Sequence, residues 1–237
     1  MPDNSRSSPA GHRDELWHRI VHAARRADPA TGCAAVVADA ALERLAGVDA
    51  VVITIRGRGL AQHQLAVTDA WGRRVEELQY TTGEGPSVTA FTTGDPVLVT
   101  ILTDHGARWP GFTDAAGAIG VAAVFTFPLR TAAANLGTMT FYRRSPGTIP
   151  CPMFADAREL ADLAAVMLLA DSRTEVVEHI NSSTDQDAIN IATGLLAAQQ
   201  AISTDSALAQ LRATAFTTNR PLADVAHDVL DRHLHDR

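Results

Sequence analysis

Apolar residues recur along the chain with two different periods. Between residues 14 and 24, and again between residues 31 and 47, they recur at helical spacing, which predicts two helices separated by Asp28-Pro29. The period then changes, because residues 50–55 (AVVITI) form the β-branched run that is typical of a central strand. Residues 1–12 are polar and contain Ser, Pro and Gly, so we expect a disordered tail before the first helix.

Further strands are predicted over residues 64–67, 96–101, 121–129 and 136–142. Helical segments are expected at 75–78 and 109–119, and the loop 81–87 (TTGEGPS) ends the first of them. Asn135 and Gly137 favour a hairpin between the last two strands. Helices and strands in this order predict an α+β layer with an antiparallel sheet flanked by helices, and not a parallel βαβ fold.

A long helix is expected from Ala155 to about Ile180. It is apolar over more than half of its circumference, so it must bury two faces and needs a partner beyond the sheet. We expect that partner to be a second copy of the helix, which predicts a homodimer.

The last fifty residues predict three short helices. The first runs from Asp187 to Gln200, the second follows an N-cap at Ser203, and the third has Pro221 in its first turn. An apolar stripe marks the third helix at Leu222, Val225, Ala226, Val229 and Leu230. These helices form an all-α bundle that is small enough to need docking or dimerisation for further burial.

Composition and charge narrow the possible functions. The longest nearly apolar run, residues 161–170, is about half of the ~20 residues that cross a bilayer, and the chain opens without an apolar leader segment. We therefore expect a cytoplasmic protein with no membrane contact. All twenty basic residues are arginine, and the net charge of −7 argues against a broad nucleic-acid-binding surface, so any such role must rest on a local patch.

Residues 14–172 resemble a GAF sensor domain, in the version common in actinobacterial regulators. The segments that carry this resemblance are 78–87 (LQYTTGEGPS), 96–99 (PVLV), 108–112 (RWPGF) and 124–129 (VFTFPL). The resemblance implies a sensor domain over residues 13–172 that binds an unknown small molecule or protein signal.

Residues 178–234 resemble the ANTAR domain, a three-helix RNA-binding module of transcription antiterminators. The resemblance rests on Ile189 and on segments 192–196 (ATGLL), 203–208 (STDSAL), 211–215 (LRATA) and 219–226 (NRPLADVA). It implies a connecting helix and an RNA-binding domain over residues 173–237. Such domains act by stabilising paired hairpins in a nascent transcript, so that a terminator cannot form.

The chain departs from the usual family pattern at several positions. Thr193 stands where the family usually has lysine, Ser206 where it has glutamate, Leu208 where it has an aromatic residue, and Ser87 where the loop usually has cysteine. Residues 178–237 also carry eight acidic side chains and four arginines. A second hypothesis is therefore a sensor or scaffold that has lost RNA binding and works through protein contacts.

The candidate sensor pocket is formed by Glu84, Ser87, Arg108 and Trp109. Two glycines beside Pro86 would let the backbone approach a ligand, with Glu84 and Ser87 as polar anchors. Arg108 and Trp109 would place a guanidinium and an indole at the pocket mouth. The alternatives are a tight turn at 83–86 and a tryptophan that belongs to the core.

The candidate RNA surface is small and polar, as suits recognition of unpaired loop bases by hydrogen bonds and arginine contacts. Its residues are Thr193, Gly194, Gln199, Arg212, Asn219 and Arg220. The alternative is that these residues form only the solvated face of the bundle.

No enzyme motif stands in a suitable context, so we expect no catalytic residues, no cofactor and no metal. His227, Asp231 and His235 share a helical face, but no fourth ligand accompanies them. A GAF-type methionine sulfoxide reductase would need two neighbouring thiols, and the sequence gives no sign that Cys33 and Cys151 meet.

Overall fold

A computed structural model describes residues 9–24, 26, 32–56, 62–131, 135–171, 184–218 and 220–235, with the backbone alone for 9–16, 171, 184–187, 234 and 235. The first helix, α1, spans Pro9–Ala24 and so begins within the predicted tail; residues 1–8 lie outside the described part. No described helix is long and apolar enough to cross a membrane.

Five antiparallel strands form one sheet in the order β2-β1-β5-β4-β3, which confirms the predicted α+β class. The strands are β1 (Ala50–Arg56), β2 (Gln62–Val67), β3 (Val97–Val99), β4 (Ala123–Arg130) and β5 (Asn135–Arg143). The predicted pairing of the last two strands is confirmed, since Phe125 lies opposite Phe141 in the β4–β5 register.

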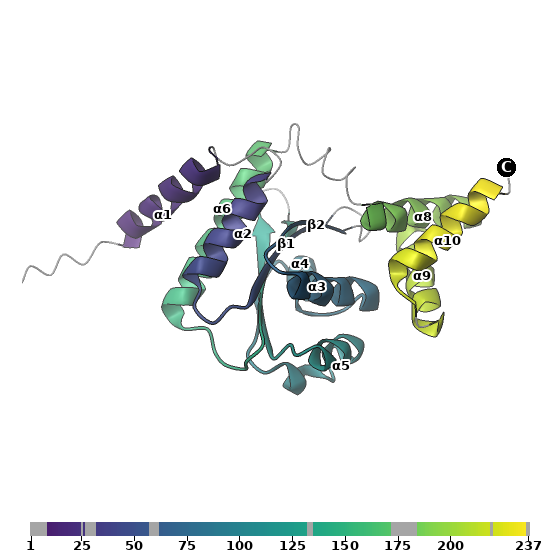
Figure 1. Cartoon of the computed structure of the whole chain (residues 1–237), viewed down its shortest axis with the longest axis horizontal. Coiled ribbons are helices and arrows are strands. Elements are labelled where there is room, and N and C mark those ends of the chain that lie inside the picture. Colours follow the sequence, from purple (N-terminus) through teal and green to yellow (C-terminus); the bar gives the residue numbers. More distant parts are fainter. Residues whose placement is uncertain are drawn as a thin grey trace, which may run out of the picture.

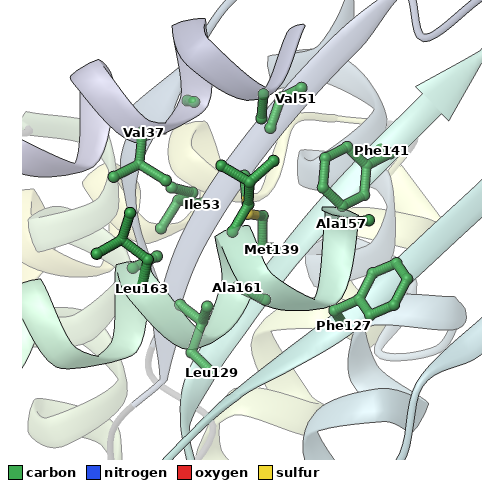
Figure 2. Packing of buried hydrophobic residues seen from close by; sticks show 14 of the residues in the cluster. Val37, Val51, Ile53, Phe127, Leu129, Met139, Phe141, Ala157, Ala161 and Leu163 are labelled. Carbon is green, nitrogen blue, oxygen red and sulfur yellow. The ribbon is translucent and has the colours of Figure 1, made fainter. Parts of the chain in front are cut away.

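Helices α2 (Gly32–Arg44) and α6 (Cys151–Asp171) cover one face of the sheet (Figure 1). Figure 2 shows Val37 of α2 and Leu163 of α6 packed over Ile53 and Met139 of the sheet. Phe125, Phe127 and Phe141 lie in this cluster. The rings of Phe127 and Phe141 meet edge to face, with centroids 5.8 Å apart.

The apolar faces of α6 are covered largely within the chain. Its side chains pack against the sheet and against α2, so α2 supplies the second partner that the sequence pattern required. Val166 and Leu169, near the end of α6, are 49% and 47% exposed. The helix is described as far as Asp171, and the predicted continuation to Ile180 lies outside the described residues.

The opposite face of the sheet is covered by α3 (Ala70–Thr82), α4 (Pro86–Thr93) and α5 (Pro110–Ala118), with a short 3-10 turn at Leu102–His105. The helix α3 is longer than the predicted segment 75–78, because Asp69 caps it by accepting a hydrogen bond from the backbone nitrogen of Trp71. The helix α4 was not predicted, although Pro86 stands at its first turn, where proline is favoured.

The C-terminal bundle consists of α8 (Thr184–Gln200), α9 (Thr204–Thr218) and α10 (Leu222–His235). The predicted N-cap is confirmed, since the Ser203 hydroxyl accepts a hydrogen bond from the backbone nitrogen of Ser206 at 3.1 Å. Residues 172–183, between α6 and α8, lie outside the described residues. In Figure 1 the bundle lies on the α3 side of the sheet, away from α2 and α6.

Candidate functional site

A network of buried polar side chains lies between the sheet and helices α3 and α4. We call it the polar cluster, and its members are Arg56 at the end of β1, Glu76 and Gln79 on α3, Ser87 on α4 and Tyr142 on β5. The members come from four separate elements, and all five are at most 6% exposed. Their burial means that each must find its hydrogen-bond partners within the protein.

The carboxylate of Glu76 is the centre of the polar cluster. Its Oε1 accepts from the Ser87 hydroxyl at 2.9 Å and lies 3.3 Å from Nη2 of Arg56, with which it forms an ion pair. Its Oε2 accepts from Nε2 of Gln79 at 3.1 Å and from the Tyr142 hydroxyl. A buried carboxylate with four donors and an opposite charge is well compensated for its loss of hydration.

Gln79 and Ser87 tie α3 to the start of α4. The backbone nitrogen of Ser87 donates to Oε1 of Gln79 at 2.7 Å. Gly85 has φ +130°, and a Cβ there would lie 2.4 Å from the same Oε1. Only glycine therefore fits this turn, because both its backbone angle and its closeness to Gln79 exclude a side chain.

Burial sets the electrostatics of the polar cluster. Burial raises the pKa of Tyr142 well above 10.0, and the negative charge of Glu76 raises it further. Burial also lowers the pKa of Arg56, although Glu76 opposes that shift. Tyr142 is therefore held as a neutral donor, while the ion pair with Glu76 opposes the loss of the Arg56 proton.

Further polar atoms beside the cluster have no hydrogen-bond partner among the described residues. They are the hydroxyls of Thr54 and Thr138, both side-chain amide atoms of Gln62, and Nε of Arg56. Thr54 lies opposite Thr138 in the β1–β5 register, and Gln62 lies opposite Arg56 in the β1–β2 register. Donors and acceptors gathered in this way suit hydrogen bonds to a small polar molecule.

The four predicted pocket residues lie in two different environments. Ser87 is a member of the polar cluster. Glu84 instead accepts a hydrogen bond from the backbone nitrogen of Phe112 at 3.0 Å, in the first turn of α5, where a negative charge is favourable. Trp109 is 3% exposed and donates to the Thr89 hydroxyl at 3.1 Å. The exposed guanidinium of Arg108 lies 4.5 Å from the centroid of the Trp109 ring.

The predicted RNA-binding residues are spread over the bundle. Thr193 is 7% exposed, and its hydroxyl donates to the carbonyl oxygen of Ile189. Gly194 is exposed, with nothing within 4 Å of a Cβ built on it. Gln199 bonds the ring of His233 at 3.0 Å, and Asn219 lies outside the described residues.

The two predicted RNA-binding arginines have different surroundings. Arg220 is exposed and forms a 2.5 Å ion pair with Asp228 on α10. Arg212 instead faces the N-terminal domain, with its guanidinium carbon 5.2 Å from the ring centroid of Tyr80 on α3. Phe216, one turn beyond Arg212, is 87% exposed. It is not among the RNA-binding candidates predicted from the sequence.

A cavity of about 530 Å³ lies between the two domains. Residues of α3, of the α5 region and of the bundle line it, among them Arg74, Leu78, Tyr80, Ile119, Ile189 and Leu222. Its volume falls within the range of small-molecule sites.

The cysteines and histidines do not form a reactive or metal-binding group in the described part of the chain. Cys33 lies on α2 and Cys151 begins α6, and no disulfide joins them. No group of three potential metal ligands occurs among the described side chains, and the side chain of His235 is outside them.

Comparisons with known proteins assign both parts of the chain. Residues 28–172 match the GAF domain family, and residues 182–230 match the ANTAR domain family. No curated protein matches the sequence.

Among solved structures, the chain is similar to the GAF domain of a phosphoenolpyruvate-protein phosphotransferase from Coxiella burnetii, with a TM-score of 0.55 and 16% identity over 72% of this chain and 99% of that one. It is also similar to the GAF domain of the corresponding protein from Acinetobacter, with a TM-score of 0.52 and 11% identity over 69% and 96% of the two chains. At these identities the likeness concerns the fold alone.

Proposed function

The chain belongs to the GAF domain family and carries an ANTAR domain after its GAF domain, and from this premise we propose a signal-responsive regulator that binds RNA hairpins. The succession of the two domains is the observation that carries the proposal. This architecture is typical of non-enzymatic regulators, so we assign no catalytic residue and no cofactor. We place the protein in the cytoplasm, where nascent transcripts are made. Its actinobacterial character stays a prediction from the sequence motifs.

In this proposal the GAF domain receives the signal at the polar cluster. The side-chain atoms of Thr54, Gln62 and Thr138 that have no hydrogen-bond partner in the described part of the chain lie beside Arg56, on the face of the sheet that α3 and α4 cover. A small polar ligand with both donors and acceptors would satisfy these atoms. Of the four residues first assigned to the pocket, Ser87 has the contacts that suit this role, while Glu84, Arg108 and Trp109 support the region around α5.

The ANTAR domain would contact RNA through Gly194, Gln199, Arg212, Asn219 and Arg220. Arginine guanidinium groups make paired hydrogen bonds to phosphates and base edges, which lysine cannot match. The exposed ring of Phe216 adds a surface on which an unpaired loop base can stack. Thr193 would act indirectly, since its side chain is buried and its hydroxyl donates to the carbonyl oxygen of Ile189 in the same helix.

Selection of bound RNA from total cellular RNA tests the proposal. The full chain should recover transcripts that share paired hairpins, and gel-shift titration should give an affinity that falls as salt rises, because phosphate contacts release counterions. Failure to enrich any hairpin RNA, together with no shift at any salt concentration, would contradict the RNA-binding function.

One observation favours the second hypothesis, a sensor or scaffold that does not bind RNA. The two arginines of the proposed RNA surface already have contacts within the chain, Arg212 with Tyr80 and Arg220 with Asp228. Under this hypothesis those contacts are permanent, and the RNA selection would enrich no transcript.

A further inference from the structure

One residue of the GAF domain belongs to the hydrophobic core of the ANTAR bundle. Tyr80, at the C-terminal end of α3, is 3% exposed and packs in a cluster whose other described members all come from α8, α9 and α10. Leu208, Leu211 and Leu222 are among them. The bundle therefore has a face that is completed by α3 of the same chain.

Arg212 lies at the same contact. Its guanidinium packs over the Tyr80 ring, at 5.2 Å from carbon to centroid, in a cation–π arrangement. Burial lowers its pKa and the positive charge of Arg56 adds to this, while Tyr80 and Asp205 oppose the shift. Its Nε is buried and has no hydrogen-bond partner among the described residues. In this position the Arg212 guanidinium is held by an aromatic face, and no ion pair joins it to a carboxylate of the described residues.

The backbone of α3 is shaped to admit this guanidinium. Gly83 caps the helix in the left-handed conformation, with φ +72°. A Cβ at this glycine would lie 3.0 Å from Nη1 of Arg212. Gly83 thus serves both the end of α3 and the close approach of Arg212.

We infer that the Arg212 face of the ANTAR bundle has two competing partners, the C-terminal end of α3 and an RNA hairpin. The inference rests on the RNA-binding function proposed above. While α3 is in place, Tyr80 covers Arg212 and RNA binds weakly. An RNA phosphate offers Arg212 a charged acceptor in place of the neutral Tyr80 ring, so RNA displaces α3 from this face.

The same helix joins this contact to the polar cluster. Tyr80 follows Gln79 directly, and Glu76 lies one turn earlier, so a shift of α3 that rearranges the cluster also moves Tyr80. A ligand that favours one position of α3 would change the fraction of chains in which Arg212 is accessible. The cavity between the domains leaves room for such a movement.

The test compares RNA affinity in variants of the full chain. The probe is a labelled two-hairpin RNA recovered by selection with the wild-type chain. We expect Tyr80→Ala to bind this RNA about three- to tenfold more tightly than the wild type, the size expected for loss of one partly buried cation–π contact. Tyr80→Phe keeps the ring and should bind like the wild type, as should Arg73→Ala, an exposed position on α3. Arg212→Ala should bind at least fivefold more weakly.

Hydrogen exchange of the wild-type chain gives a second measurement that does not depend on a variant. Adding the RNA should increase amide exchange at the C-terminal end of α3 and at Gly83, because RNA takes the place of that end. Thermal melting of each variant checks that it is folded, and if Tyr80→Ala does not fold, the exchange measurement decides.

The outcomes separate this inference from the proposed function. Equal RNA affinity of wild type and Tyr80→Ala, or no added exchange in α3, would overturn the competition while RNA binding stands. Absence of RNA binding in every chain would overturn both.

Discussion

Arg56 and Glu76 form an ion pair that solvent does not reach. Nη2 of Arg56 lies 3.3 Å from Oε1 of Glu76, and the two side chains are 1% and 0% exposed. A pair of this kind is costly to break, because removal of one charge leaves the other buried and uncompensated. The pair fixes the end of β1 to the middle of α3. We expect a change of charge here to lower the stability of the GAF domain more than a change of charge at an exposed position.

Replacing Glu76 by glutamine should destabilise the protein by about 3–5 kcal/mol, since the charge of Arg56 then has no counterpart. Urea unfolding at 25 °C measures the change. Glu77→Gln is the matched control on the exposed side of α3 and should change the free energy of unfolding by less than about 0.5 kcal/mol. Similar effects of the two substitutions would show that the ion pair does not stabilise the fold.

Stability should fall as pH rises above about 10 because of Tyr142. Its folded pKa lies well above the unfolded value of 10.0, so the folded state retains a proton that the unfolded state releases. The resulting stabilisation is complete below pH 10 and is lost as pH rises toward the folded pKa. Unfolding free energies between pH 8 and pH 11 check this, and Tyr142→Phe should have a flatter profile. A profile unchanged by Tyr142→Phe would assign the loss to other groups.

Gly194→Ala separates stability from RNA binding. A Cβ at this exposed helical position meets open space, so alanine should stabilise the bundle by about 0.5–1 kcal/mol through its better helix propensity. If RNA approaches the helix closely here, the same methyl group should weaken binding. Denaturation and gel-shift measurements on one preparation test both effects, and unchanged RNA affinity would remove Gly194 from the surface.

Substitutions at Arg220 and at Asp228 should change the RNA affinity in opposite directions. Arg220→Ala should weaken binding roughly tenfold, as expected for loss of a hydrogen bond to a charged group. Asp228→Asn removes the carboxylate that pairs with Arg220 and should strengthen binding. Neither change should move the melting temperature much, since the pair is solvent-exposed. Arg232→Ala, another exposed arginine, is the control for net charge. Weakening by Arg232→Ala as large as that by Arg220→Ala would indicate only a general charge effect.

A homodimer through α6 stays a prediction, now confined to the exposed side of the helix. Light scattering at micromolar concentration should report twice the chain mass for the wild type, and Val166→Glu should give a monomer because it places a charge in the contact. Thr92→Glu, an exposed substitution on α4, should remain dimeric. A wild-type monomer would contradict the predicted assembly.

The order of the domains and most helices and strands could be predicted from the sequence, because they follow from local periodicity. Local pattern alone predicts a strand from the β-branched run at residues 50–55, an antiparallel strand pair within residues 121–142, and a helix from the apolar stripe near the C-terminus. Two local signals were missed. Asp69 extends α3 backwards by capping it, and Pro86 begins a helix where the glycines suggested only a turn.

Arg56, Glu76 and Tyr142 give no sign in the sequence that they are buried together. Glu76 is followed by the exposed Glu77, and nothing in the pattern separates the two carboxylates. Glu76 meets Arg56 across 20 residues of sequence and Tyr142 across 66. Only the packing of α3 on the sheet brings these three side chains together.

The sequence by itself determined most of the helices and strands, the family of each domain and the identity of the basic residues. Only the tertiary structure decided that Ser87 joins a closed network, that Thr193 is buried and that Arg212 packs against Tyr80. The reason is physical: periodicity records whether a position faces a core, whereas contacts between polar groups depend on which two faces the fold brings together.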